Sequence, residues 1–258
     1  MTLGQVQSCR GLSVAQFHER FVAPSQPVLL QGFASDWPAL RSWSFANLRQ
    51  QFGQLRIQVR GSDQALHVFF GNVTHLEMTL GEYLEAILQP YHAGPRPYFG
   101  NVLLSPTDAH TRALFSQFQF PQLFPRTQTQ TRIWIAGRGQ HSTIHNDNYE
   151  NLNAQIVGNK VFTLYPPAQF PKLYAQKINE GLWASPIDPC DPDLERYPLF
   201  ATLEGLRCVL EPGDVLYIPR FWWHQATAQS PSVNLNCWHQ SSAWSTAHWP
   251  DWLAASSA

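Results

Sequence analysis

The chain has 258 residues, of which 44% are hydrophobic and only 14% are charged. This length suits one large β domain or two small ones, and the composition excludes a disordered chain. The net charge of −1 excludes a global basic signal for nucleic acid, although local basic patches stay open.

The cysteines and the N-terminus carry information about the compartment. The four cysteines (Cys9, Cys190, Cys208 and Cys237) form no C-x-x-C pair, which is typical of isolated reduced thiols. The N-terminus has no long apolar segment of a secretory signal, and no apolar run is long enough to predict a transmembrane helix. We therefore expect a cytoplasmic protein without a membrane partner.

The first half of the chain predicts a mixture of helices and strands. Apolar residues at helical spacing predict helices over 13–23, 43–53 and 79–88, with Ser13 and Ser44 as N-caps of the first two. QPVLLQGF, LRIQVRG and PYFGNVLL have the short apolar or alternating pattern of strands. We assign residues 1–125 to a mixed α/β part of a single domain that spans 1–258.

From about residue 130 the pattern changes to short strands separated by turns. TRIWIAG alternates, and NLNAQIV and KVFTLYPP flank Gly158-Asn159, which predicts a two-residue hairpin. RCVLEPGDVLYIP places a Pro-Gly-Asp turn between two apolar strands. This pattern is typical of a sandwich or barrel. Residues 126–240 are thus the predicted β core, with a short tail over 241–258.

A proline-rich segment over 168–205 interrupts the predicted β core. Long insertions of this kind are often binding loops or lids, and the sequence leaves the role of this one open.

IHNDNYEN, residues 144–151, is the strongest candidate for a metal site. His145 and Asp147 are two apart, so in a strand both side chains point the same way. A second histidine would complete a set of two imidazoles and one carboxylate, which leaves open positions on a non-haem Fe(II) ion. His224, at the end of DVLYIPRFWWH, is the candidate, provided that a rolled β structure brings the two strand ends together.

Each of these residues also has an ordinary structural interpretation. A surface His and Asp two apart occur by chance in many chains, and His224 fits a core histidine under Trp222 and Trp223. The context favours the metal, because His145 directly precedes a pair of strands and His224 follows an apolar strand.

The longer motifs carry a resemblance to a known family. HNDNYENLNAQIVGNKVFTLYPP, DPDLERYPLF, LEPGDVLYIPRFWWH and VNLNCW together resemble the Jumonji-C/cupin-like 2-oxoglutarate oxygenases. The resemblance is to the small hydroxylase branch, which includes the hypoxia-inducible-factor asparaginyl hydroxylase and the tRNA wybutosine hydroxylase. It implies a mainly β fold, a double-stranded β-helix (jelly roll), with N-terminal α/β elements.

The resemblance also implies roles for individual residues. It makes His145, Asp147 and His224 the ligands of Fe(II), and Lys160 the partner of the far carboxylate of 2-oxoglutarate, with O2 as the second cosubstrate. Ser142 and Tyr98 match positions whose hydroxyl groups reach the same carboxylate. Asn151 and Asn236 match polar positions that line the pocket.

These further positions have ordinary alternatives as well. Lys160 fits a solvent-facing hairpin residue, Ser142 a loop serine and Tyr98 a core tyrosine. The two asparagines fit plain polar strand residues. The parity of Lys160 with Phe162 and Leu164 instead favours a side chain that points inward, where it needs an anion.

The sequence also departs from the family's protein-asparagine hydroxylases. Gly100 stands where those enzymes carry glutamine, and Asn153 stands where they carry an aromatic residue. The chain ends about twenty residues after Trp238, so we expect the long C-terminal dimerisation helices of some relatives to be absent or shortened. The substrate and the oligomeric state therefore stay open.

Three functions follow as hypotheses. The first is hydroxylation of a protein or peptide side chain with release of succinate and CO2. The second is the same reaction on a tRNA nucleoside, for which Arg126, Arg132 and Arg138 are a candidate basic patch. The third is a non-enzymatic cupin that binds a metal or small ligand.

Overall fold

The structure is a computed structural model of the chain. It describes residues 1–61, 70, 74–89, 98–105, 107, 111–120, 123–124, 129–179 and 181–240. The predicted tail over 241–258 lies outside these residues.

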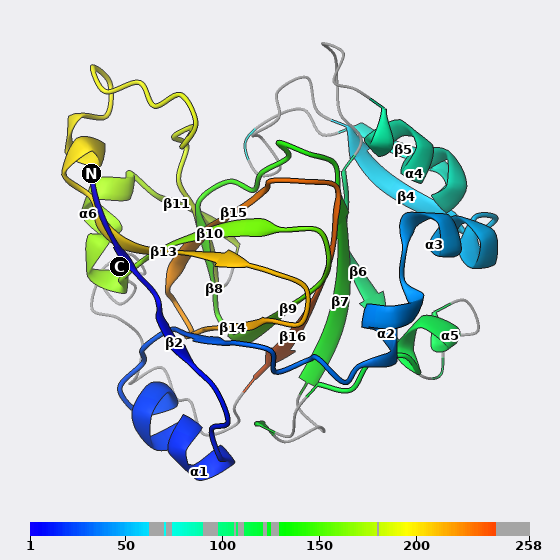
Figure 1. Cartoon of the computed structure of the whole chain (residues 1–258). Coiled ribbons are helices and arrows are strands. Elements are labelled where there is room, and N and C mark those ends of the chain that lie inside the picture. Colours follow the sequence, from blue (N-terminus) through cyan, green and yellow to red (C-terminus); the bar gives the residue numbers. More distant parts are fainter. Residues whose placement is uncertain are drawn as a thin grey trace.

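Two mixed β-sheets form the body of the described structure, with a small antiparallel pair beside them. The first sheet has the order β1 (Thr2–Gln5), β13 (Glu204–Leu210), β10 (Lys160–Tyr165), β15 (Trp223–Ala228), β8 (His145–Asp147), β12 (Leu182–Ala184) and β11 (Gln176–Asn179). The second has the order β2 (Gln7–Cys9), β3 (Val28–Leu30), β14 (Val215–Ile218), β9 (Glu150–Val157), β16 (Ser232–His239), β7 (Thr129–Ala136) and β6 (Phe99–Leu104). Figure 1 shows the two sheets curling around a common interior.

Consecutive strands alternate between the two sheets, which is the winding of a double-stranded β-helix. β9, β14 and β16 belong to one sheet, and the strands next to them in the chain, β10, β13 and β15, belong to the other. The predicted fold class is thereby confirmed. The predicted hairpin at Gly158-Asn159 was wrong, because β9 and β10 do not pair and this turn crosses between the sheets.

Glycine is required at that crossing for two reasons. Gly158 has φ 67°, a left-handed conformation that L side chains rarely adopt. A Cβ there would also lie 2.1 Å from the carbonyl oxygen of Pro231. Gly158 therefore permits a sharp turn from β9 to β10 that lies in close backbone contact with Pro231, in the turn from β15 to β16.

The N-terminal half supplies the predicted helices and covers one face of the second sheet. The helices are α1 (Val14–Phe17), which continues as a π-helix η1 (His18–Val22), α2 (Pro38–Ser42), α3 (Phe45–Phe52), α4 (Leu80–Leu88) and α5 (Arg112–Phe115). The N-caps Ser13 and Ser44 are confirmed, and Thr79 caps α4 in a capping box with Glu82. β4 (Arg56–Gly61) and β5 (Thr74–Thr79) form the antiparallel pair. No helix among the described residues is long and apolar enough to cross a membrane.

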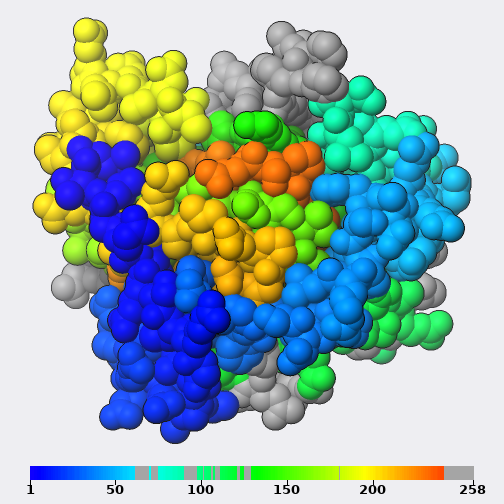
Figure 2. All heavy atoms as spheres, in the orientation of Figure 1, coloured from blue at the N-terminus to red at the C-terminus, as the bar shows by residue number. Residues whose placement is uncertain are grey.

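The N-terminal strands also close the edges of both sheets. β1 pairs in parallel with β13, and β2 pairs in parallel with β3. In Figure 2 the blue N-terminal segment accordingly lies beside the gold residues of β13.

The segment over 168–205 is more ordered than a loop. It begins within the 3-10 helix η3 (Pro167–Gln169) and contains α6 (Phe170–Leu173), β11, β12 and the 3-10 helix η4 (Pro198–Thr202). β12 pairs with β8, the strand of His145 and Asp147. β11 and β12 thus extend the first sheet, and a role of this segment in binding stays a prediction.

The central strands β9 and β16 of the second sheet are buried on both faces, and each face has a different character. The outward residues of β16, such as Val233 and Leu235, belong to the main apolar cluster with α1, α3 and α4. The inward residues Asn234 and Asn236 are polar and equally buried. An apolar cluster that includes Phe162, Leu164 and Leu216 fills another part of the space between the sheets. The interior is thus partly packed and partly a polar pocket.

Replacing Leu235 by alanine is expected to destabilise the fold by about 2–5 kcal/mol, because it leaves a cavity in a fully buried site of the main core. Urea unfolding measures the effect as a lower midpoint at an unchanged slope. Leu103→Ala is the matched control, since Leu103 on β6 of the same sheet is 49% exposed. Equal losses for the two variants would contradict this assignment of the core.

Candidate metal centre

The structure brings His145, Asp147 and His224 together at one point. His145 and Asp147 lie on β8, and His145 is directly opposite His224 of β15 in the pairing of these strands. The two imidazole ring centroids are 4.3 Å apart, and Nε2 of His224 lies 3.6 Å from Oδ2 of Asp147. One ligand atom from each residue lies within 4.8 Å of the others. Asp147 and His224 are 77 residues apart in the sequence, and the pairing of β8 with β15 brings them together in space.

Backbone carbonyl groups orient both imidazoles. Nδ1 of His145 lies 2.8 Å from the carbonyl oxygen of Thr143, and Nδ1 of His224 lies 3.0 Å from that of Trp222. A carbonyl oxygen can only accept, so each Nδ1 carries the proton and each lone pair is on Nε2. This second contact is how metal-binding histidines are usually held in their tautomer.

The electrostatics of His224 favour the neutral form that a metal needs. Burial, and to a smaller extent the neighbouring His145, lower the pKa of His224 to about 4, against the opposing effects of Asp147 and the Trp222 carbonyl. His224 is therefore neutral at neutral pH, and protons do not compete with a cation for its Nε2. Two neutral imidazoles and a carboxylate suit a borderline divalent metal such as Fe(II).

A pocket lies beside these three residues, between the two sheets, with about 410 Å³ of empty space that includes open solvent. Its walls contain every residue that the sequence predicted for the site: Tyr98, Ser142, His145, Asp147, Asn151, Lys160, His224 and Asn236. The remaining wall residues are Trp134, Asn153, Phe162, Ala226, Asn234 and Trp238, of which Asn153 had been singled out from the sequence as a departure from the asparaginyl hydroxylases.

Lys160 is a buried cation at the start of β10. It is only 5% exposed, so the alternative of a solvent-facing hairpin lysine is excluded. Burial lowers the pKa of Lys160 to about 8, and no carboxylate among the described residues forms an ion pair with it. A buried ammonium group without an anion is costly, so this position is suited to an anionic ligand.

Two hydroxyl groups face the same pocket. Oγ of Ser142 accepts a hydrogen bond from the backbone N–H of Ala226 at 3.0 Å, which leaves its own proton available to a ligand. Tyr98 lines the pocket next to Trp134, with ring centroids 5.9 Å apart. Burial raises the pKa of Tyr98, so its hydroxyl stays protonated and can donate.

The inward asparagines are held by hydrogen bonds in the pocket wall. Nδ2 of Asn153 donates to Oδ1 of Asn151 at 2.9 Å, and Nε1 of Trp134 donates to Oδ1 of Asn236 at 2.9 Å. Nδ2 of Asn234 donates to the carbonyl oxygen of Ala154 at 3.0 Å. The interpretation of Asn151 and Asn236 as plain strand-edge residues is therefore excluded, because both are almost completely buried.

The departure at Gly100 has a steric cause. A Cβ at Gly100 would lie 2.2 Å from Cε3 of Trp134, inside the indole ring. Trp134 thus fills the space above residue 100, so a glutamine cannot be accommodated there without moving the indole. In the sequence, Trp134 was visible only as one residue of an alternating strand.

Glu150 supports the turn that leads to His224, and the sequence prediction missed it. Its Oε2 accepts from the hydroxyl of Tyr217 at 2.6 Å and from the backbone N–H of Arg220 at 3.2 Å. The backbone N–H of Phe221 in the same turn donates to the carbonyl oxygen of Asp147 at 3.0 Å. Phe221 has φ 64°, a conformation that a bulky residue adopts only when its surroundings enforce it.

The arginines proposed as a basic patch are in different settings. Arg132 lies over the ring of Trp238, with its Cζ 4.9 Å from the ring centroid, and Trp238 stacks on Tyr149. Arg138 is exposed beyond the end of β7. Arg126 lies outside the described residues. Recognition of tRNA by this group stays a prediction.

Comparisons with known proteins agree with this geometry. The model of the cupin-like domain matches residues 14–244 of the chain. HSPB1-associated protein 1 of Homo sapiens is 30% identical over 242 residues, which cover 85% of this chain and 49% of that protein. The bifunctional peptidase and (3S)-lysyl hydroxylase JMJD7 of Homo sapiens is 24% identical over 269 residues, covering 86% of this chain and 80% of that protein.

A third relative, lysine-specific demethylase 8 of Xenopus tropicalis, is 26% identical over 231 residues, covering 88% of this chain and 51% of that protein. The chain thus spans about half the length of most of these relatives. The family model nevertheless covers most of the chain, including the residues that line the pocket. The chain therefore belongs to the cupin-like domain family that includes the Jumonji-C proteins.

Proposed function

We propose that the chain is an Fe(II)- and 2-oxoglutarate-dependent oxygenase that hydroxylates a protein or peptide side chain. The observation that carries the proposal is the meeting of His145, Asp147 and His224 beside a pocket that contains the buried Lys160. The family generally uses this metal and this cosubstrate, and the ligand chemistry fits both. When bound, iron and 2-oxoglutarate supply the oxidising chemistry, with O2 as oxidant and succinate and CO2 as products.

The residues of the chain bind and orient these groups. His145, Asp147 and His224 would hold the metal through two imidazole nitrogens and one carboxylate. The ammonium group of Lys160 neutralises the far carboxylate of 2-oxoglutarate, and the hydroxyl groups of Ser142 and Tyr98 donate to it. Positioning of this kind is the main contribution of a protein to cofactor chemistry.

The substrate side of the pocket favours a ligand different from that of the asparaginyl hydroxylases. Trp134 blocks the space above Gly100, and Asn153 presents an amide in place of an aromatic ring. The names of two relatives, a (3S)-lysyl hydroxylase and a lysine-specific demethylase, refer to reactions at lysine. A protein or peptide substrate is therefore the proposal, with a tRNA nucleoside as the alternative.

Release of succinate tests the proposed reaction. The chain is incubated with Fe(II), ascorbate and isotope-labelled 2-oxoglutarate, with and without a panel of peptides. We expect succinate above background for the natural chain and none for His145→Ala, because the variant lacks one imidazole ligand. Absence of succinate for the natural chain with every peptide would contradict the proposal.

Two further measurements separate the alternatives. A salt-sensitive gel shift with tRNA at low ionic strength supports the nucleoside substrate, and the absence of binding removes it. Metal binding without any affinity for 2-oxoglutarate in calorimetry supports a non-enzymatic cupin.

A further inference from the structure

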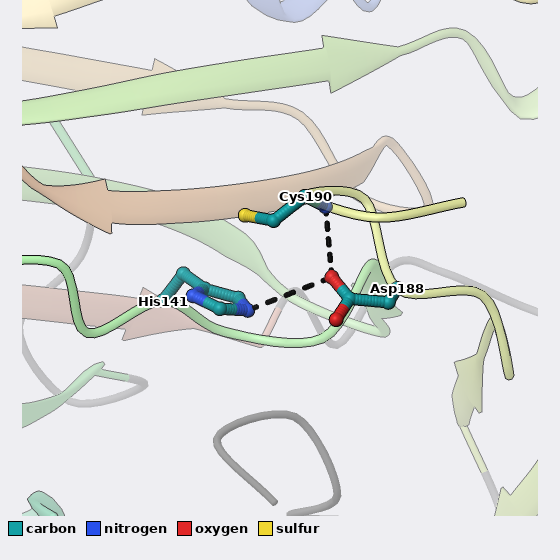
Figure 3. A group of neighbouring side chains, drawn as sticks. All are labelled: His141, Asp188 and Cys190. Carbon is teal, nitrogen blue, oxygen red and sulfur yellow. Dashed lines mark hydrogen bonds and ion pairs between the residues drawn. The ribbon is translucent and has the colours of Figure 1, made fainter. Parts of the chain in front are cut away.

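A second group of metal-binding side chains lies outside the pocket. His141 precedes β8, and Asp188 and Cys190 lie on the loop that follows β12. A ring nitrogen of His141, a carboxylate oxygen of Asp188 and Sγ of Cys190 all lie within 4.8 Å of one another. Figure 3 shows the three side chains around one small space, with Nε2 of His141 directed at Asp188.

The imidazole of His141 is buried without a hydrogen-bond partner for one nitrogen. The side chain is only 8% exposed, and Nε2 has no hydrogen bond to any described residue. Nδ1 lies 3.3 Å from the carbonyl oxygen of Gly139, so the proton is on Nδ1 and the lone pair is on Nε2. Buried polar atoms are nearly always satisfied, so an unpaired Nε2 aimed at a carboxylate and a thiol indicates a missing partner.

A cation between the three groups supplies that partner. Nε2 of His141 lies 3.9 Å from Oδ1 of Asp188, which is too long for a hydrogen bond but suits two ligands of one ion. Oδ1 of Asp188 also accepts from the backbone N–H of Cys190 at 2.8 Å, which fixes the carboxylate toward the group.

A nucleophilic Cys-His-Asp relay fits the geometry less well. In such a relay the carboxylate binds one imidazole nitrogen and the nucleophile binds the other. Here Asp188 faces Nε2, while Nδ1 faces a backbone carbonyl. Burial and the charge of Asp188 also raise the pKa of the Cys190 thiol, the opposite of an activated nucleophile. The three groups converge on a point and do not form a chain.

We propose that His141, Asp188 and Cys190 form a second metal site, selective for Zn²⁺, with its fourth position open to water. A thiolate excludes Mg²⁺ and Ca²⁺, which prefer oxygen ligands, whereas Zn²⁺ binds sulfur, imidazole nitrogen and carboxylate oxygen. Binding releases the thiol proton of Cys190 to solvent, because the thiolate is the ligand. Cys190 is exposed, so the ion has a path from solvent.

The ion would fasten the loop after β12 to the edge of the barrel. The start of this loop is already bound to the segment that leads into β8. The backbone N–H of Ser185, directly after β12, donates to the carbonyl oxygen of Ile144, directly before β8, at 2.8 Å. Asp188 and Cys190 lie three and five residues after Ser185. A zinc ion between them and His141 would connect this later part of the loop to the segment before β8. His141 directly precedes Ser142, which lines the pocket. The proposed zinc site therefore lies next in sequence to a residue of the pocket wall.

Cobalt substitution tests the site in the full chain. Co²⁺ is added to the metal-free protein, and a thiolate-to-cobalt charge-transfer band is sought in the near ultraviolet. We expect the band in the natural chain, its loss on addition of Zn²⁺, and its absence in Cys190→Ser and His141→Ala. Cys9→Ser, which changes another accessible cysteine, is expected to keep the band.

The band distinguishes this site from the candidate iron centre, which contains no sulfur ligand. Asp147→Ala is therefore expected to keep the band even though it damages that centre. A natural chain without the band, or a band that survives in Cys190→Ser, would overturn the proposal and leave the iron centre untouched.

Thiol labelling provides a second readout. Zn²⁺ is expected to slow the reaction of Cys190 with a disulfide reagent by about tenfold or more at a tenfold excess over the dissociation constant. His141→Ala is expected to remove this protection. Equal labelling rates with and without Zn²⁺ would contradict the proposed site.

Discussion

Replacing His224 by alanine is expected to lower the affinity for Fe(II) by more than about 100-fold and to reduce succinate release to background. The residues that merely orient metal ligands are typically worth about 10–100-fold in metal affinity, and the loss of a ligand itself exceeds that range. His224 supplies one of two imidazoles, opposite His145 in the strand pairing, and no other described histidine shares the group. Metal affinity is measured by anaerobic titration, and activity by labelled succinate.

The alternative for His224, a core histidine under the tryptophans, predicts a different result. In that case the variant loses stability but keeps its metal affinity, because two ligands and the pocket remain as before. Metal affinity is therefore compared at a temperature where circular dichroism shows the variant to be folded. His75→Ala is the matched control, since His75 is exposed on β5 and belongs to neither metal cluster.

Asp147→Ala extends the test to the carboxylate. Asp147 lies 3.6 Å from Nε2 of His224, and its side chain is only 12% exposed. The variant is expected to match His224→Ala in metal affinity, because either change leaves two ligands. Full metal affinity in a folded His224→Ala or Asp147→Ala variant would contradict the assignment.

Helices were predictable because their signals are local. Ser13 and Ser44 cap their helices from within three residues, and the apolar spacing that follows needs no knowledge of the rest of the chain. The same holds for the strands as single segments. Partner strands are a different matter, since Gly158-Asn159 has the chemistry of a hairpin and yet joins two sheets.

The inward face of β9 illustrates the limit of periodicity. NLNAQIV alternates polar and apolar residues, a pattern that usually places the polar face in solvent. Here Asn151, Asn153 and Gln155 point inward, while Leu152 and Ala154 face the N-terminal helices. Both faces are buried, so alternation alone could not tell which one lines the pocket.

The cluster of His145, Asp147 and His224 was predictable because a short motif carries two of these residues, and the apolar strand before His224 marked that histidine as the third. Interactions between distant segments gave no such signal. The contact of Trp134 with Gly100 and the hydrogen bonds of Glu150 to the turn at Arg220 depend on strand register. His141 is likewise more than forty residues from Asp188 and Cys190, and the pairing of β8 with β12 brings the segments that carry them together.

Lys160→Met is expected to weaken binding of 2-oxoglutarate by at least about 30-fold. Removal of one partner from a buried charge pair costs about 2–5 kcal/mol, and each 1.4 kcal/mol is about tenfold in affinity. Calorimetry with the metal-loaded protein measures the change. Lys172→Met is the control, because the ammonium group of Lys172 lies on the surface, where it donates to the carbonyl oxygen of Thr202.

The affinity for 2-oxoglutarate is also expected to depend on pH through Lys160. Because burial lowers the pKa of Lys160 to about 8, the ammonium form is mostly present at pH 7 and becomes scarce above pH 8. The affinity for 2-oxoglutarate should therefore fall by about tenfold from pH 7 to pH 9. Above pH 8 the Lys160 amine must first take up a proton from solvent before it can bind the carboxylate. Lys160→Met should lack this dependence, and an equal fall in both proteins would place the titrating group elsewhere.

The same substitution is expected to stabilise the protein in the absence of 2-oxoglutarate. The pKa of Lys160 is about 8 when folded, against its ordinary value of 10.5, so between these values the unfolded chain binds the extra proton. The penalty for burying the charge is complete below about pH 8 and is lost as the pH rises toward 10.5. Lys160→Met removes it, on the order of 3 kcal/mol at pH 7, with a gain that shrinks at alkaline pH.

Thermal unfolding at pH 7 and pH 10, with and without 2-oxoglutarate, separates the two effects of this lysine. The natural chain should gain stability from 2-oxoglutarate, whereas the variant should start more stable and gain little. A residue that binds a carboxylate in a buried site is expected to destabilise the protein without 2-oxoglutarate and to stabilise the protein that has bound it. A variant less stable than the natural chain at pH 7 would instead indicate that Lys160 has an anionic partner in the empty protein.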